Sequence, residues 1–360
     1  MDKDRIVVVN PGSTSTKLGL FRATDTGVEK IVVETIDHPQ EELDKFQNVL
    51  EEKDMRKKAV LDFMAKHGVT KENLLAFAVR GGPVKAMEGG TYEVNEKIVD
   101  DILNWRVEAH HISLVGIVIG YELAKEFGVK AYFTDPVSVD EFEDYARLSG
   151  LPELPRRSHG HMLNLRAVVR KYASEVGKDI KDVNAVAVHL GGGFSIAAIK
   201  NGRIVDINNA NEGGPFQVER AGSLPVGDLV RYIYDKKPDK VETLKRIAGK
   251  GGMYAHLGTK DFREALKMAE TDEKAKLIID AMLYQVSKEI AAMASVLKGN
   301  VEIIIVTGGL AYNDYVINFF KHYVGWIAPF KTYPGGFEME ALAEGAWRVI
   351  KGIEQPKVYQ

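Results

Sequence analysis

The sequence predicts an α/β protein with two related domains, and two observations carry this prediction. Short apolar runs alternate with segments of helical periodicity along the whole chain, as is typical of α/β proteins. A strand–turn–strand–turn–strand pattern also occurs twice, and Gly12 and Gly191, in the first turn of each copy, lie about half a chain length apart. Since a repeated pattern of this size indicates a repeated supersecondary unit, we expect duplicated domains.

The first copy begins with a β-branched run, Ile6–Val9, that is typical of a buried strand. A turn signal follows, then four hydroxyl residues and a cation: Asn10, Pro11, Gly12, Ser13, Thr14, Ser15, Thr16 and Lys17. Alternation resumes after Lys17, and Val28–Ile36 completes the pattern as a third strand. Backbone N–H groups, small hydroxyls and an ammonium group at one hairpin tip suit a phosphate, although no Walker A motif is present. An ordinary polar hairpin is the alternative.

The second copy repeats these parts with glycines in place of hydroxyls. The apolar run Val186–Leu190 contains His189 and leads into Gly191, Gly192 and Gly193. A second strand follows over residues 194–199, and a third over 203–207, after a turn at Asn201-Gly202. The second turn is therefore also expected to bind phosphate.

Length and composition limit the classes of function. The chain of 360 residues is comfortable for two domains, and 45% hydrophobic with 28% charged residues describes a globular protein. With a net charge of −3 and well-mixed charges, we expect neither a nucleic-acid nor a membrane partner. Cysteine is absent, which excludes disulfides, thiolate metal ligands and a cysteine nucleophile. Without an apolar segment of spanning length or a signal peptide, the expected location is the cytoplasm.

Between and after the meanders, most segments have helical patterns. We expect helices at 41–67, 107–127, 139–148, 161–176, 274–297, 315–324 and 341–351. Further strands are expected at 75–79, 130–135 and 301–306. We place the first domain at 1–177 together with a C-terminal helix at about 345–360, and the second at 178–344. No low-complexity linker separates the halves, which suggests two domains around a central cleft.

These features together resemble the acetokinase family of acetate, propionate and butyrate kinases, over nearly the whole chain. The segment Asn10–Lys17 is similar to the family's N-terminal signature, and His189-Leu190-Gly191 to its phosphate hairpin. Two departures from the acetate kinase pattern, Arg80 where histidine is expected and Gly192 where asparagine is usual, resemble the butyrate kinase branch. The resemblance implies two duplicated ribonuclease H-like (actin-like ATPase) domains. It also implies transfer of the ATP γ-phosphate to butyrate or a short branched-chain fatty acid.

The resemblance assigns roles to several side chains. Arg220 matches an essential arginine that would hold the transferring phosphoryl group or the carboxylate with two hydrogen bonds. His161 matches the active-site histidine, although a small alignment error would exchange it with His159. Arg80 is a candidate clamp for the substrate carboxylate, and His111 resembles a histidine that lines the substrate site. Each of these side chains has a structural alternative, which is a surface arginine on a loop or a histidine near a helix start.

Nucleotide and metal contacts follow from the same resemblance. Thr307–Asn313 resembles the adenosine loop, from which Gly308, Gly309 and Asn313 are carried over. Asp135 closes a strand at the carboxyl end of the predicted sheet, where a carboxylate would bind Mg²⁺ through water. Glu338 and Glu340 are equal candidates for a later contact with Mg²⁺. The expected cofactors are therefore ATP and Mg²⁺, and the family implies a homo-oligomer, a dimer or larger.

Alternatives remain for the substrate. An acetate or propionate kinase of the same family differs only in chain-length preference, because each methylene contributes about 1–3 kcal/mol. Pro83, Val84, Ala86 and Met87 are candidates for the acyl pocket and equally for the core. A sugar kinase on the same fold, with Asp135 as the base, and a non-catalytic nucleotide-gated module are more distant alternatives.

Overall fold

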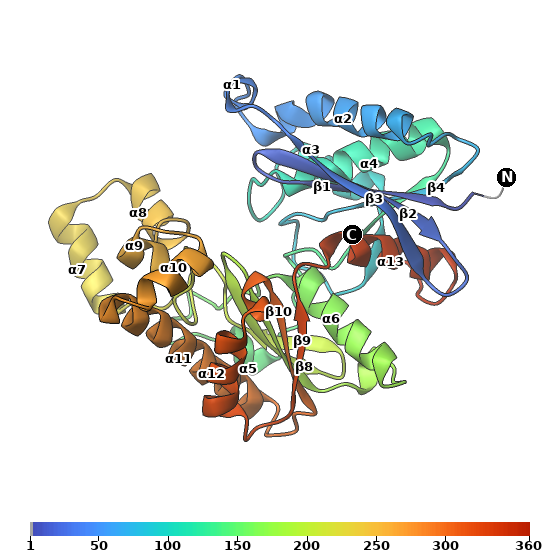
Figure 1. Ribbon diagram of the computed structural model, residues 1–360. Helices are drawn as coiled ribbons and strands as arrows, with labels where there is room; N and C mark the ends of the chain where they lie inside the picture. The colour runs from blue at the N-terminus through green and yellow to red at the C-terminus, as the bar shows by residue number, and fades with distance from the viewer. Residues whose placement is uncertain (1–2) are drawn as a thin grey trace. The chain divides into compact units, whose positions relative to one another are not determined.

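The computed structural model describes residues 3–360, which divide into two compact units (Figure 1). The first unit extends to Val139 and resumes at Phe337–Gln360, whereas the second is the continuous segment Asp140–Gly336. In the described part of the chain, no helix combines the length and apolarity needed to cross a membrane.

The first unit contains a six-stranded sheet with the order β3-β2-β1-β4-β6-β5. Its strands are β1 (Arg5–Pro11), β2 (Ser15–Ala23), β3 (Val28–Asp37), β4 (Leu74–Val79), β5 (Thr91–Glu93) and β6 (Lys130–Thr134). The first three strands form the antiparallel meander that the sequence predicts, and β4 and β6 continue the sheet in parallel with β1. The parallel strands therefore end at one common edge, where Asn10, Arg80 and Asp135 follow or close them.

Helices cover both faces of this sheet. They are α1 (Gln40–Leu43), the 3₁₀ helix η1 (Val49–Glu52), α2 (Lys53–Lys66), α3 (Glu96–Leu103), α4 (Ser113–Phe127) and α13 (Glu338–Ile350). Figure 1 shows α2, α3 and α4 on one face and α13 on the other. Side-chain alternation explains this arrangement, because Val7 and Val9 of β1 join the core under α2 and α4, while the other face of the strands meets α13.

The second unit repeats the topology in a five-stranded sheet with the order β11-β10-β7-β8-β9. Its strands are β7 (Ala185–Leu190), β8 (Phe194–Lys200), β9 (Arg203–Ile207), β10 (Ile303–Gly308) and β11 (Phe330–Pro334). Again a three-stranded antiparallel meander comes first, and β10 lies parallel to β7 as β4 lies parallel to β1. The predicted duplication is therefore confirmed by strand order and direction.

The second unit is richer in helices. They are α5 (Asp144–Arg147), α6 (Met162–Glu175), η2 (Ile180–Asp182), α7 (Val226–Lys236), α8 (Lys240–Ile247), α9 (Gly252–Leu257), α10 (Phe262–Ala269), α11 (Glu273–Val296), η3 (Gly309–Tyr312) and α12 (Asp314–Val324). Val186, Val188 and Leu190 of β7 join the core formed with α11 and α12. His189 therefore points to the opposite face of β7, on which α6 packs.

Two predicted helices are wrong in extent. The helix expected at 139–148 is reduced to α5, because Asp140 and Glu141 use their carboxylates to accept hydrogen bonds from backbone N–H groups of Phe142 (3.1 Å) and Ile204 (2.8 Å). The helix expected from 107 begins only at Ser113, whose N–H is bound by the His111 imidazole (3.2 Å). Helices α7 to α10 correspond to residues for which the sequence analysis proposed no element.

Along the chain, the compact units are divided at 139/140 and 336/337, whereas the boundaries expected from the sequence were 177/178 and about 344/345. The difference has a physical reason. Residues 140–177 are tied to the second sheet by polar contacts: the Arg166 guanidinium donates to the Gly202 carbonyl (3.1 Å), and Arg156 donates to the Asp206 carboxylate (2.7 Å).

Candidate functional site

The glycine turn between β7 and β8 is the centre of the candidate site in the second unit. A Cβ added to Gly193 would lie 2.5 Å from the Arg220 guanidinium carbon, so the arginine rests directly against this turn. Arg220 Nη1 donates to the Ala210 carbonyl (2.8 Å), and the Glu219 N–H donates to the Gly192 carbonyl (3.3 Å). Burial lowers the pKa of Arg220, and the neighbouring Glu219 carboxylate partly opposes this effect. Because arginine stays protonated, the turn carries a fixed positive charge.

Two histidines lie on the α6 side of the same turn. His161 immediately precedes α6, and its ring stacks on His189 with 4.1 Å between ring centroids and an interplanar angle of 21°. His161 Nδ1 lies 2.8 Å from the Ser195 hydroxyl, and His189 Nδ1 lies 2.6 Å from the Asn164 amide nitrogen. Since an amide nitrogen only donates, His189 Nδ1 accepts, and the proton of the neutral ring is on Nε2. His189 Nε2 faces the turn, because a Cβ on Gly191 would lie 3.1 Å from it.

The structure separates the two histidines that the sequence left interchangeable. His161 contacts the hairpin through Ser195 and stacks on His189, whereas His159 Nε2 lies 3.1 Å from the Asn211 side-chain amide. The geometry thus supports His161 as the candidate next to the glycine turn.

Buried amides hold the glycine turn in place. The Gln217 side chain accepts a hydrogen bond from the Phe194 N–H (2.6 Å) and donates to the Ala210 carbonyl (2.9 Å). Asn208 accepts from the Ile196 N–H (2.7 Å) and donates to the Phe194 carbonyl (3.2 Å). Neither residue was predicted from the sequence, and the same is true of Asn164 and Ser195. Only Asn164 had a usable signal, which is its helical spacing of three residues from His161.

The loop after β10 lies close to the same hairpin. Gly308 has φ +93°, and a Cβ there would lie 2.3 Å from the Leu190 carbonyl oxygen, so only glycine fits where β10 and β7 end side by side. Gly309 is exposed and has open space at its Cβ position. Asn313 caps α12 by accepting a hydrogen bond from the Tyr315 N–H (2.9 Å). Gly308 is thus tied to the packing of the hairpin, while Gly309 faces solvent.

In the first unit, a buried arginine holds the hydroxyl-rich turn between β1 and β2. Arg56 of α2 is fully buried, and it donates to the backbone carbonyls of Ser15 (2.9 Å) and Ser13 (3.2 Å) and to the Thr16 hydroxyl (2.9 Å). Its remaining donors bind the Glu52 carboxylate (2.6 and 2.8 Å). Ser13 and Lys17 are exposed and Ser15 is half-buried, so this turn presents hydroxyls and an ammonium group to solvent.

Arg80 and its neighbours lie at the carboxyl edge of the first sheet. Arg80 Nη1 donates to the Asn10 side-chain oxygen (3.3 Å), and the Asn10 amide contacts the Met339 sulfur (3.9 Å). Burial lowers the pKa of Arg80, with the Glu338 carboxylate acting in the opposite direction. The surrounding protein, and to a smaller extent the Arg80 charge, lower the pKa of His111 and so favour its neutral form. Asn10, Arg80, His111 and Glu338 therefore form one electrostatically coupled group.

The predicted metal ligands occupy different environments within the first unit. Asp135 is 2% exposed, has φ +41°, and accepts a hydrogen bond from the Gly90 N–H (2.7 Å). Glu340 lies 3.9 Å from the Lys30 ammonium, whereas Glu338 acts on Arg80. Across residues 3–360, no group of three or more histidine or carboxylate side chains is arranged to hold a metal ion.

The repeated sheets, each with a turn at which candidate residues gather, define an actin-like ATPase fold with two related units. Among solved structures, the chain is similar to the acetate kinase of Porphyromonas gingivalis, with a TM-score of 0.75 and 19% identity over 96% of this chain and 99% of that one. Residues 154–321 match the model of the acetokinase family.

Full-length relatives extend this match. The chain is 48% identical over 356 residues to the probable butyrate kinase 2 of Caldanaerobacter subterraneus subsp. tengcongensis, covering 99% of both chains. It is 45% identical over 360 residues to butyrate kinase 2 of Clostridium acetobutylicum, covering 99% of this chain and 100% of that one. The chain belongs to the acetokinase family.

Proposed function

We propose that this chain is a carboxylate kinase that transfers the γ-phosphate of ATP to butyrate or a short branched-chain fatty acid, reversibly forming an acyl phosphate and ADP. The observation that carries the proposal is the convergence of Arg220, His161 and His189 on the glycine turn of the second unit. The full-length relatives named butyrate kinase support the choice of acceptor.

Phosphoryl transfer to a carboxylate requires alignment of donor and acceptor and stabilisation of the charge on the transferring group. Within residues 3–360, the Arg220 guanidinium makes one hydrogen bond, through Nη1 to the Ala210 carbonyl, so it has donors left for phosphate oxygens. His161, whose Nδ1 contacts the Ser195 hydroxyl, and His189, whose Nδ1 contacts the Asn164 amide, place their stacked rings beside the turn, where we assign them to the charge that develops on the transferring group. The backbone N–H groups of Gly192 and Gly193 complete this set of hydrogen-bond donors. Direct transfer to the carboxylate requires no covalent enzyme intermediate.

The first unit supplies the groups we assign to the acceptor and to the transferred phosphate. Arg80 binds the substrate carboxylate, and neutral His111 donates a hydrogen bond without adding a second charge beside it. Asn10, which orients Arg80, binds phosphate together with Ser13, Ser15 and Lys17. Pro83 and Val84, both buried, and half-buried Met87 line the acyl chain, whereas Ala86 is exposed and less suited to this role.

ATP and Mg²⁺ are the proposed cofactors, with Gly308, Gly309 and Asn313 at the adenosine. The carboxylates fit an ion that arrives with the nucleotide and keeps much of its water, because no three such groups converge within residues 3–360. Asp135 and Glu338 would hold it through water, since Glu340 is turned toward Lys30. When bound, Mg²⁺ would neutralise phosphate charge. We further propose a homo-oligomer, a dimer or larger, and a cytoplasmic location where ATP is available.

A series of carboxylates tests the proposal. Acyl phosphate is trapped as the hydroxamate with ATP, Mg²⁺ and acetate, propionate, butyrate or isobutyrate, and kcat/KM is compared. Since one methylene contributes about 1–3 kcal/mol, butyrate or isobutyrate should exceed acetate by about tenfold or more. A preference for acetate would contradict the assigned acceptor, and phosphorylation of glucose or glycerol without any hydroxamate would contradict the reaction class.

A further inference from the structure

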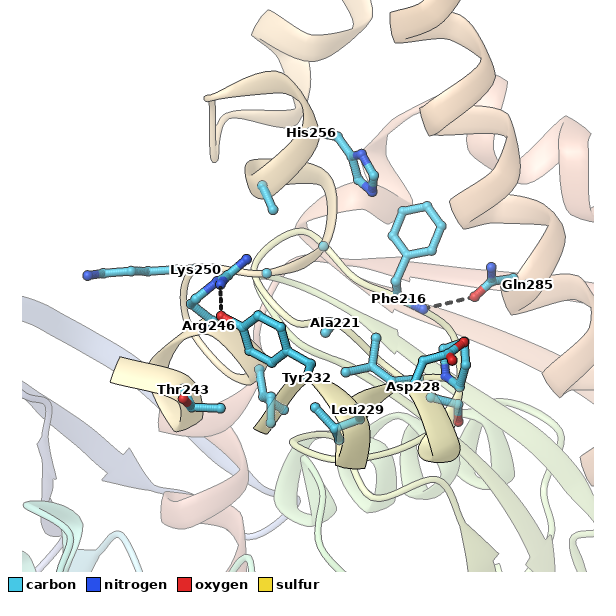
Figure 2. A pocket seen from close by; sticks show the side chains of 17 residues that line it. Phe216, Ala221, Asp228, Leu229, Tyr232, Thr243, Arg246, Lys250, His256 and Gln285 are labelled. Carbon is cyan, nitrogen blue, oxygen red and sulfur yellow. Dashed lines mark hydrogen bonds between the residues drawn. The ribbon is translucent and has the colours of Figure 1, made fainter. Parts of the chain in front are cut away.

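A cavity of about 520 Å³ lies in the second unit, between α7, α8, α9 and the segment after Arg220. Figure 2 shows Phe216 and His256 at one side, Tyr232 and Arg246 facing them, and Leu229 and Asp228 of α7 along the wall. Its volume is within the range of small-molecule sites. None of the residues assigned above to phosphate, acceptor, nucleotide or metal lines this cavity, so the cavity is separate from the candidate functional site.

The cavity combines an apolar lining with one available cation. Phe216, Leu229 and Ile247 provide apolar surface, and the Arg246 guanidinium donates to the Tyr232 hydroxyl (2.8 Å) while lying 5.7 Å from the centre of its ring (Figure 2). Arg246 has no carboxylate partner among residues 3–360, and it therefore has donors free for a ligand.

The other charged side chains around the cavity are already paired. The Lys250 ammonium binds Glu242 (3.1 Å), and the Asp228 carboxylate binds Arg231 (2.5 Å). A ligand with several negative charges would lie beside the Asp228 carboxylate and would find no second unpaired cation among the lining residues. The charges around the cavity therefore suit a ligand with a single negative group. The apolar lining requires that this group carry a hydrocarbon body.

One wall of the cavity is joined through the backbone to the catalytic candidate Arg220, which does not itself line the cavity. Ala221 and Ile247 both line the cavity, and the Ala221 N–H donates to the Ile247 carbonyl (2.8 Å). Arg220 itself pairs with Ala248 in an antiparallel bridge, and the Gly251 N–H donates to the Glu219 carbonyl (3.0 Å). A ligand that moves the segment after α8 therefore moves the backbone of Arg220.

We propose that this cavity is a second ligand site, which takes a monocarboxylate with a longer apolar chain than butyrate and alters turnover through Arg220. The carboxylate binds Arg246 and the Tyr232 hydroxyl, and the chain lies against Phe216, Leu229 and Ile247. The proposal that the cavity binds this ligand is independent of the proposed function, whereas the proposed effect on turnover rests on it.

Octanoate is the probe, titrated calorimetrically into the full chain at saturating butyrate so that the acceptor site is occupied. The wild type should bind it, and Arg246→Gln should weaken binding by about tenfold or more, because a charge-assisted hydrogen bond is lost. Ala255→Trp, at an exposed position on the cavity wall, should block binding by filling the space. Lys236→Gln, an exposed lysine at the end of α7 that does not line the cavity, is the matched control and should bind as the wild type.

Turnover gives the second measurement. Octanoate should change kcat for butyrate in the wild type and in Lys236→Gln, but not in Arg246→Gln or Ala255→Trp. No binding of octanoate, or equal binding by all four proteins, overturns the inference even when butyrate is phosphorylated. If butyrate is not phosphorylated but Arg246-dependent binding persists, the proposed function fails and the site stands. A change of molecular mass on light scattering in Ala255→Trp, with no octanoate binding to the wild type, would overturn the site in favour of a subunit interface.

Discussion

The two hairpin turns have the same place in their sheets but use arginine in opposite ways. In the first turn, the five hydrogen bonds of Arg56 all go to the protein, to Glu52, Thr16 and the carbonyls of Ser13 and Ser15. In the second turn, the neutral amides of Gln217 and Asn208 hold the backbone, and the Arg220 guanidinium lies against Gly193 with one hydrogen bond within residues 3–360. An arginine with all donors occupied holds structure, while one with donors left can bind a ligand.

The surroundings of the turns differ, although their lengths do not. Each turn has three residues between its strands, and each closes through a backbone hydrogen bond, from the Gly12 N–H to the Ser15 carbonyl (2.8 Å) and from the Gly191 N–H to the Gly193 carbonyl (3.2 Å). In the first turn, the carbonyls of Ser13 and Ser15 point toward α2 and accept from Arg56, whereas in the second the Gly192 carbonyl accepts from the Glu219 N–H (3.3 Å). A side-chain cation therefore binds the carbonyls of the first turn, and a backbone N–H takes this place in the second.

Removing Arg220 should have the largest effect, and it should be on catalysis. Arg220→Ala is expected to lower kcat by about a thousandfold or more, in the range known for arginines that stabilise transferring phosphate. The free energy of unfolding should change by only about 1 kcal/mol, because one hydrogen bond is lost. Steady-state kinetics and urea unfolding measure both quantities. Arg231→Ala, an exposed arginine on α7, is the control, and comparable kinetics for the two variants would reject the assignment.

Removing Arg56 should affect stability first. Arg56→Met leaves the Glu52 carboxylate and the carbonyls of Ser13 and Ser15 without their donor. Breaking a buried ion pair by removing one partner costs about 3–5 kcal/mol, which urea unfolding would detect. Lys58→Met on the same helix breaks only an exposed pair with Asp62 and should cost less than about 0.5 kcal/mol. Equal losses in the two variants would show that Arg56 is not a brace.

Gln217, the neutral side chain that holds the second turn, should contribute less to the free energy of unfolding than Arg56. Gln217→Leu leaves the buried Phe194 N–H unpaired, and we expect a loss of about 1–3 kcal/mol in the free energy of unfolding. Gln40→Leu, whose amide binds only Asp44 at the surface, serves as the control. A loss in Gln217→Leu as large as in Arg56→Met would remove the distinction between a charged and a neutral brace.

The smallest effect concerns pH and the first turn alone. His38 is buried against the Thr16 hydroxyl (2.8 Å), and burial together with the Arg56 charge lowers its pKa below 6.5. Because the unfolded chain then binds a proton more readily, stability is unaffected above pH 6.5 and falls as the pH decreases through that value, levelling off below the lowered pKa. His38→Gln should weaken this pH dependence in urea unfolding at about pH 7.5 and about pH 5.5. An unchanged dependence would assign it to other groups.

Much of the fold could be predicted from the sequence, because a meander of short apolar strands leaves a strong local pattern. The extent of the helix around Glu141 could not be predicted, because the Glu141 side chain accepts a hydrogen bond from the backbone N–H of Ile204, which is distant in the sequence. The role of Arg56 in holding the first turn could not be predicted from the sequence. Arg56 lies some forty residues from the turn, on a helix of mixed charge where it resembles a solvated side chain.

The candidate site was predictable in its types of residue more than in their arrangement. Chain order could not separate Glu338 from Glu340, two positions apart, until the structure placed Arg80 near the first and Lys30 near the second. Similarly, the Ser195 hydroxyl distinguishes His161 from His159 only once β8 and α6 are packed.

The position of α13 has a consequence for how the molecule is made. The Trp347 indole of this helix donates to the Thr24 carbonyl (2.8 Å), and Gly345 packs so closely on Thr134 that a Cβ would lie 2.1 Å from its hydroxyl. During synthesis, the first sheet leaves the ribosome long before the helix that covers its second face. The second unit comes from one continuous segment and can fold before the first unit has received α13. The nascent chain thus exposes an apolar sheet face, open to chaperones, until the last turns of helix emerge.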